Sequence, residues 1–311
     1  MKPPPAPKKP TIPLILTPRH EQILKTIHAY RYVTVQDIKN LLFSKGSLTY
    51  ARSLLSALAG GKDHAERHYL YRFPFPTGSA GNRERVFTLG ALGRDFLANE
   101  LGMPVEWYFR PSKAERLSHS HVLHHLLVTR FVVAAQAYTR NHPHLHLLQT
   151  RLGHELARHQ ARVAGEKKER TAKPAIIPDA WLLFEAQTRG SHYPVLVEID
   201  RGTQFRAKFQ AQIQARVAFI RSGDYANVFD TPAVVIAYVT CGQVATHRQT
   251  RLKTMATWTQ EVLTKLDLQS WEAIFRFTAI SLETLYDDIP SLLEEAVWYR
   301  PDPSQPVPLF G

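Results

Sequence analysis

The sequence predicts an α+β protein with two domains, the second built as an α/β sheet. The chain has 311 residues, enough for two domains of about 150 residues each. Apolar residues near the start of the chain recur with helical spacing. The apolar residues just before Leu89 instead alternate, as in short strands. From Ser118 onward, apolar runs bounded by turn residues alternate with helical patterns, which is typical of a sheet with covering helices.

Three helices open the N-terminal domain. Thr17 is a good N-cap and Pro18 suits the first helical position. A second helix starts at Thr34, where Asp37 stands three residues on as a weaker form of the capping box. The third covers 47–59, with its leucines on one face.

Two short strands follow, at 69–73 and 85–89, separated by a loop rich in Pro, Gly and Asn. Three helices followed by a hairpin is the layout of a winged helix. A fourth helix is expected at 93–101. We therefore predict a winged-helix domain over 14–102, preceded by a disordered basic arm at 1–13.

The second domain is predicted over 118–300, after a linker at 103–117 and before a tail at 301–311. Its element order is α-β-β-β-α-β with additions. The predicted helices cover 118–140, 203–223 and 250–266, and the predicted strands cover 144–150, two runs within 176–204, 232–240 and 274–280.

The chain is strongly basic, with a formal net charge of +12 and a pI of about 9.8. This charge favours a polyanionic partner, either nucleic acid or an acidic membrane surface. The single cysteine, Cys241, allows no intramolecular disulfide and fits a reducing cytosol. Because no signal peptide is visible and the apolar stretch at 122–138 is broken by His and Arg, we expect a cytoplasmic protein without a membrane span.

The third helix has the pattern of a DNA-recognition helix, because one face is apolar and the other is polar and basic. Arg suits guanine or phosphate, and Thr and Ser suit phosphate oxygens. The predicted DNA-binding residues are Thr49, Tyr50, Arg52 and Ser53 on this helix, with Arg72, Arg83 and Arg85 on the wing. The alternatives are a solvated helix in a small helical domain and a protein-interaction module.

Three carboxylates gather at the ends of two apolar runs in the middle of the chain. Glu198 and Asp200 alternate on one strand and so share a face, and Asp179 can join them from the neighbouring strand if the register allows. Mg²⁺ or Mn²⁺ bound there would activate water against a phosphodiester. The alternative is that these acids mark strand ends and a salt-bridged turn.

Other chemistries lack support in the sequence. No Gly-rich phosphate loop or nucleophile elbow is present, so we expect no nucleotide cofactor and no Ser-His-Asp hydrolase. The histidines of 119–125 lack a second ligand pair for zinc, and we expect a polar helix face or one that lines the acidic site.

Several segments, in order, resemble known families. Pro178-Asp179 and Glu198-Ile199-Asp200 resemble the motifs of the PD-(D/E)xK nuclease superfamily, whose core is α-β-β-β-α-β. The chain also resembles the replication-relaxation family of plasmids and other mobile elements. The matching segments are "LTPRHEQILKTI", "VFTLGALGRDFL", the His-bearing helix, "PDAWLLF" and "VEIDRGT" followed by a helix carrying Lys208.

The resemblance implies a restriction-endonuclease-like second domain and DNA binding in plasmid replication, relaxation or mobilisation. Asp200 stands where active nucleases carry a lysine, and Lys208 is the candidate replacement. Two hypotheses follow. Either Asp179, Glu198 and Asp200 bind the metal and Lys208 assists a nick, or the fold is a scaffold that binds double-stranded DNA, relaxosome or replication proteins without cutting. A non-catalytic transcriptional regulator or adaptor is the alternative function.

Overall fold

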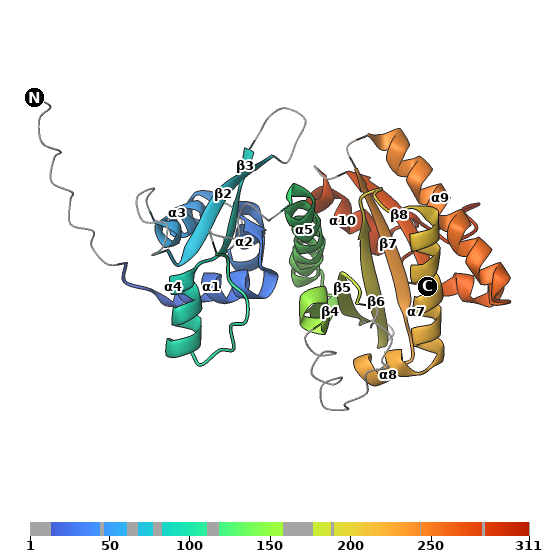
Figure 1. The fold of residues 1–311 in the computed structure, drawn as a ribbon, viewed down its shortest axis with the longest axis horizontal. Coiled ribbons are helices and arrows are strands. Elements are labelled where there is room, and N and C mark those ends of the chain that lie inside the picture. Colours follow the sequence, from blue (N-terminus) through green and yellow to red (C-terminus); the bar gives the residue numbers. More distant parts are fainter. Residues whose placement is uncertain are drawn as a thin grey trace, which may run out of the picture. The chain divides into compact units, whose positions relative to one another are not determined.

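The computed structural model describes residues 14–43, 47–60, 68–76, 83–110, 118–157, 177–187, 190–242, 244–281 and 284–310. They form two compact units, each described here by itself: the first unit runs up to Arg110 and the second begins at Ser118 (Figure 1). Both combine helices with a sheet, so the predicted α+β class is confirmed. The predicted basic arm at 1–13 lies outside the described residues. None of the described helices is long and apolar enough to cross a membrane.

The first unit contains the predicted helices and hairpin in the predicted order. Its elements are α1 (Pro18–Tyr30), β1 (Val33–Thr34), α2 (Val35–Leu42), α3 (Leu48–Ala59), β2 (Leu70–Pro76), β3 (Arg83–Leu89) and α4 (Ala91–Asp95), which continues as a π-helix (Phe96–Glu100). The strands form an antiparallel sheet in the order β1-β3-β2. The two-residue strand β1 is an addition to the prediction.

Both predicted helix starts are confirmed, and one of them is a buried polar cluster. At α2, the backbone N–H and the hydroxyl of Thr34 each donate to Oδ2 of Asp37 at 2.7 Å. The N–H of Asp37 donates back to Oγ1 of Thr34 at 3.3 Å. Both residues are fully buried, so this reciprocal cap satisfies groups that water cannot reach.

The segment predicted as a linker belongs in part to the first unit. The Trp107 ring packs edge-on against Tyr32, with centroids 5.5 Å apart. The N–H of Phe109 donates to the carbonyl of Leu89 at 2.8 Å, and its ring stacks on Phe73. The linker prediction is therefore wrong for 103–110, because these half-buried aromatic side chains pack against other rings of the first unit; 111–117 lies outside the described residues.

The second unit contains the predicted α-β-β-β-α-β order with further elements at its end. The elements are α5 (His119–Asn141), β4 (Leu145–Leu152), β5 (Ala180–Ala186), β6 (Ser191–Asp200), α7 (Arg206–Arg221), α8 (Asp224–Phe229), β7 (Val235–Gly242), α9 (Ala245–Lys265), a 3₁₀-helix (Gln269–Ile274), β8 (Phe275–Ser281), α10 (Leu285–Glu294), β9 (Trp298–Tyr299) and β10 (Pro306–Val307).

These strands form one mixed sheet in the order β10-β9-β8-β7-β6-β5-β4. The strands β4, β5 and β6 pair antiparallel, whereas β6, β7 and β8 run parallel. Helices α7 and α9 cover one face, and α5 and α10 pack together on the other (Figure 1). The carboxyl ends of β6 and β7 therefore open at one edge, the place where open α/β sheets commonly bind ligands.

The face under α7, α8 and α9 carries the larger aromatic core. Trp181 of β5 stacks on Phe229 of α8, and Phe209 of α7 packs against Tyr238 of β7. All four side chains are at most 4% exposed. Arg216 lies among these apolar residues, as the next section describes.

The predicted tail is part of the fold. Leu309 is 1% exposed, and the Phe310 ring contacts Phe184 and Tyr193 at centroid distances of 5.2 and 5.0 Å. The strand β10 pairs with β9 at the edge of the sheet. The prediction of a tail at 301–311 is therefore wrong, because apolar residues near its end pack against the sheet; Gly311 is outside the described residues.

Replacing Thr34 with alanine should lower the free energy of unfolding of the first unit by about 1–2 kcal/mol, because the buried Asp37 carboxylate loses the hydroxyl donor and the buried Asp37 N–H loses its acceptor. Thr26→Ala is the matched control, since the Thr26 hydroxyl bonds only its own helix at Gln22. Urea unfolding of the full chain, with hydrogen exchange of α2 peptides assigning the transition, measures both. Equal stability of the two variants would contradict the role of this cap.

Candidate functional site: a carboxylate cluster and a basic helix face

The pairing of β5 with β6 brings two of the three predicted acids level with each other. Ala180 lies opposite Val197 in this antiparallel pair, so Asp179, one residue earlier, is level with Glu198. Gly153 holds this end of the strand: its N–H donates to the carbonyl of Asp179 at 2.8 Å. A Cβ at Gly153 would lie 2.5 Å from the carbonyl oxygen of Pro178, so only glycine permits the approach.

Asp179 is held by two donors from different elements. Its Oδ1 lies 2.8 Å from Nε2 of His124 on α5. Its Oδ2 accepts the backbone N–H of Ile199 on β6 at 2.8 Å. The expectation that a histidine of α5 lines the acidic site is met by His124.

Glu198 forms a buried ion pair with Arg216, which α7 delivers to the same face of the sheet. The side chains are 15% and 4% exposed. The ring of Tyr238 lies 5.9 Å from the guanidinium carbon of Arg216. A buried ion pair of this kind is lost at high cost when one partner is removed, because the other charge is left unpaired.

Burial and the nearby charges shift the titration of this site. Burial and, in smaller measure, the charge of Asp179 raise the pKa of Glu198 to about 7, against the opposing effect of Arg216. Burial disfavours the charged imidazole of His124, but the hydrogen bond and the charge of Asp179 outweigh it and raise the pKa of His124. The site therefore retains protons above the pH at which exposed carboxyl groups lose theirs.

Asp200 is bound by a side chain of α9. Its two oxygens accept Nε and Nη2 of Arg251 on α9 at 2.9 and 3.0 Å. Its Oδ2 also accepts the N–H of Gly202 at 2.9 Å. Gly202 has a φ of +75°, which favours glycine at this turn. Asp200 is 5% exposed and bidentately neutralised.

The three predicted metal ligands are each matched to a basic side chain. We name the carboxylate cluster as Asp179, Glu198 and Asp200 with their partners His124, Arg216 and Arg251. Within the residues that the structure describes, no group of three His, Cys, Asp or Glu is placed to hold a metal ion. The donor set as arranged does not fit Mg²⁺ or Mn²⁺, which require carboxylate oxygens that are not already neutralised.

Lys208, the predicted catalytic lysine, is exposed in the first turn of α7. It forms no ion pair with any of the three acids in the described part of the chain. The helix presents Arg216 to Glu198 instead, because Arg216 shares the buried face of α7 with Phe209 and Ile213.

A polar hollow of about 330 Å³ lies beside the cluster. Its walls come from the start of α5 and from the segment that follows β6, and we call it the β6 pocket. It is lined by Ser118, Ser120, His121, His124, Ile199, Asp200, Arg201, Thr203 and Gln204. Nη1 of Arg201 donates to the carbonyl and hydroxyl oxygens of Ser120, both at 2.7 Å, and so ties the two walls together.

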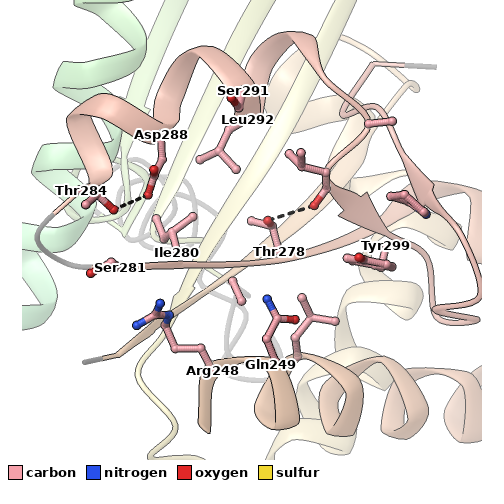
Figure 2. A pocket seen from close by; sticks show the side chains of 15 residues that line it. Arg248, Gln249, Thr278, Ile280, Ser281, Thr284, Asp288, Ser291, Leu292 and Tyr299 are labelled. Atoms are coloured by element: carbon pink, nitrogen blue, oxygen red, sulfur yellow. Dashed lines mark hydrogen bonds between the residues drawn. The ribbon is translucent and has the colours of Figure 1, made fainter. Parts of the chain in front are cut away.

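A second hollow of the same unit, about 460 Å³, lies between α9, β8 and α10 (Figure 2). Thr284 donates to Asp288 at 2.6 Å, and Nη1 of Arg248 donates to the carbonyl of Gly242 at 2.7 Å. Its charged side chains thus have partners in the protein, and its lining shares no residue with the β6 pocket.

The predicted DNA-binding residues of α3 form an exposed face. Thr49, Tyr50, Arg52 and Ser53 are all exposed, whereas Ala51, Leu54, Leu55 and Leu58 are buried. The Tyr50 side chain is 53% exposed and its ring packs edge-on against Phe43. The helix therefore has the apolar and polar faces that the sequence predicts.

Two of the predicted wing arginines lie on the side of the hairpin that faces α3. Arg52 and Arg85 line one hollow of about 450 Å³ together with Val35, Gln36, Leu48 and Glu84. Arg72 lies opposite Phe87, two residues from Arg85, so Arg72 and Arg85 share a face of the sheet. The side chain of Arg83 lies outside the described residues.

The model of the replication-relaxation family matches residues 24–231, which extend from within α1 to just beyond α8. The chain belongs to the replication-relaxation family. No curated protein and no solved structure matches it. The region that matches this family includes the exposed face of α3 and the pairs Asp179–His124 and Glu198–Arg216, but Arg251, the partner of Asp200, lies beyond it.

Sequence analysis did not find Arg216 or Arg251. Arg216 could have been found from the sequence, because it stands on the apolar stripe of α7 between Ile213 and Val217, where a charged side chain requires a buried partner. Arg251 could not, because it reaches Asp200 only through the packing of α9 on the sheet.

Stability of the second unit should fall as pH rises between about pH 5 and pH 8. The pKa of Glu198 is about 7 in the folded protein against an ordinary 4.5, and the pKa of His124 is also raised, so the folded state binds more protons over this range. Glu198→Gln should reduce the slope of the free energy of unfolding against pH, and adding His124→Asn should reduce that slope further. Urea unfolding at several pH values measures the slope, with Glu295→Gln at an exposed residue as the control. A wild-type slope in Glu198→Gln would contradict the assignment.

Proposed function

We propose that the protein binds duplex DNA through its first unit during the replication or relaxation of a plasmid or other mobile element. Family membership supplies the biological context. The observation that carries DNA binding is the hollow shared by Arg52 of α3 and Arg85 of β3, beside the exposed Thr49 and Ser53. A formal net charge of +12 supports a polyanionic partner.

The first unit is best explained as a winged helix, with α3 in the major groove and the β2–β3 hairpin as the wing. The order of three helices and a hairpin, the antiparallel β1-β3-β2 sheet and the amphipathic α3 support this proposal. Arg52 would contact base edges or phosphate, and Arg72 and Arg85 would contact phosphates along the backbone.

For the second unit we propose a nuclease-like scaffold that does not cut DNA. Asp200 occupies the motif position of a lysine, and Arg251 neutralises it in two hydrogen bonds. Arg216 forms an ion pair with Glu198, and His124 forms one with Asp179. Relaxation of DNA would then require a partner that supplies the strand cut, such as a relaxosome or replication protein.

A metal-dependent nickase is the second candidate, because the β5–β6 register does place Asp179 level with Glu198. For this activity both carboxylates would have to exchange a basic side chain for a divalent cation.

Arg52→Ala should weaken duplex DNA binding by about 1–3 kcal/mol, because α3 loses its one cation at the proposed groove surface. Lys265→Ala, an exposed change of equal charge at the end of α9, is the matched control. Fluorescence anisotropy with a labelled duplex at several salt concentrations measures both. Binding that falls steeply with salt is expected; the absence of duplex affinity at low salt would favour the adaptor alternative.

Supercoiled plasmid should stay supercoiled when incubated with the protein alone in Mg²⁺ or Mn²⁺, because each acid already has a basic partner. Gel electrophoresis of the plasmid measures this. If the plasmid is nicked, Asp179→Ala and Glu198→Ala decide its origin: loss of nicking with retained DNA affinity would establish the nickase and overturn the scaffold proposal.

A further inference from the structure

The β6 pocket has the chemistry of an anion site although an acid lies in its wall. Asp200 is the one carboxylate of its lining, and the two hydrogen bonds from Arg251 neutralise it. The remaining polar lining consists of hydroxyl, imidazole, amide and guanidinium groups. A phosphate would therefore meet donors and a net positive charge in this hollow.

Arg201 is the central cation of this lining. Both hydrogen bonds that it makes among the described residues come from Nη1, to the carbonyl and hydroxyl of Ser120. These bonds fix the guanidinium in the lining of the pocket while its Nε and Nη2 donors remain available for an anion. The hydrogen bond that His124 donates to Asp179 similarly fixes the ring of His124 in the pocket wall.

An exposed aromatic residue directly follows the pocket lining in the chain. Phe205 follows Gln204, a lining residue, directly in the chain, and it is 73% exposed. It makes no ring contact with any residue that the structure describes. Arg206, the next residue, is also exposed and bonds Glu261 of α9 at 2.7 Å. A large apolar ring left in water between cations gains nothing for the fold and suits a stacking partner.

We propose that this surface binds single-stranded DNA, with a phosphate in the β6 pocket and a neighbouring base stacked on Phe205. The ring faces of bases are covered by stacking inside a duplex and are accessible in a single strand, so an exposed aromatic beside a cationic pocket selects the single strand. The site goes beyond the proposed duplex binding, because it lies in the second unit and uses none of the residues of α3. It gives this unit a role that requires no metal.

The test is fluorescence anisotropy of the full chain with a labelled oligothymidine and, separately, with a labelled duplex. Phe205→Ala should weaken binding to the single strand about 5- to 100-fold and leave duplex binding unchanged, in line with the usual loss per stacked base. Phe205→Trp should retain single-strand affinity. Val244→Ala, at an exposed apolar residue that follows β7, should change neither.

The phosphate contact is tested with Arg201→Gln. It should weaken single-strand binding and reduce its salt dependence, whereas Lys265→Gln, with the same charge change, should have a smaller effect on both. EDTA should leave the wild-type affinity unchanged.

The proposal is overturned if the wild-type chain does not bind the oligothymidine, if Phe205→Ala stays within about twofold of wild type, or if Arg201→Gln matches Lys265→Gln. The duplex proposal fails separately, because Arg52→Ala should affect duplex binding alone.

Discussion

The antiparallel register of β5 and β6 is the constraint on which the site depends. It sets Asp179 level with Glu198, and the alternation of side chains along β6 then places Glu198 and Asp200 on the face covered by α7 and α9. Asp179 and Glu198 repel each other, because the charge of Asp179 contributes to the raised pKa of Glu198. The fold relieves this repulsion with one basic side chain from each packed helix: His124 of α5, Arg216 of α7 and Arg251 of α9.

This arrangement links the stability of the second unit to its chemistry. The same charges that a metal would otherwise neutralise tie three helices to the sheet, so removal of a basic partner would leave an unpaired charge in the interior. In the proposed nuclease-like scaffold, basic side chains of its own helices would occupy the carboxylates that metal binding needs. The neutralised Asp200 would also allow the adjacent pocket to bind the phosphate proposed above.

The two proposed DNA-binding surfaces would serve complementary tasks. The first presents an exposed polar helix face beside a basic hairpin, a surface suited to the groove of a duplex. The second presents a fixed guanidinium and an exposed phenyl ring, a surface suited to an unpaired strand. Replication opens a duplex into single strands, so a protein with both proposed surfaces would bind the DNA before and after it is opened.

The sequence by itself determined the local features of this protein. The caps at Thr17 and Thr34, the amphipathic α3 and the strand runs around Asp179 and Glu198 follow from short-range hydrogen bonding and from apolar periodicity, and the structure has them where the sequence predicts. The family membership also follows from motif order along the chain.

Only the tertiary structure decided how charges and chain ends are partnered. Arg251 lies 51 residues from Asp200 and reaches it only because α9 packs beside β7, the neighbour of β6. Residues 103–110 and the end of the chain were predicted as a linker and a tail, yet Trp107, Phe109 and Phe310 pack partly buried aromatic rings against other rings of their units. Such contacts join residues that are far apart in sequence, and a local sequence pattern does not indicate which distant side chain will pack there.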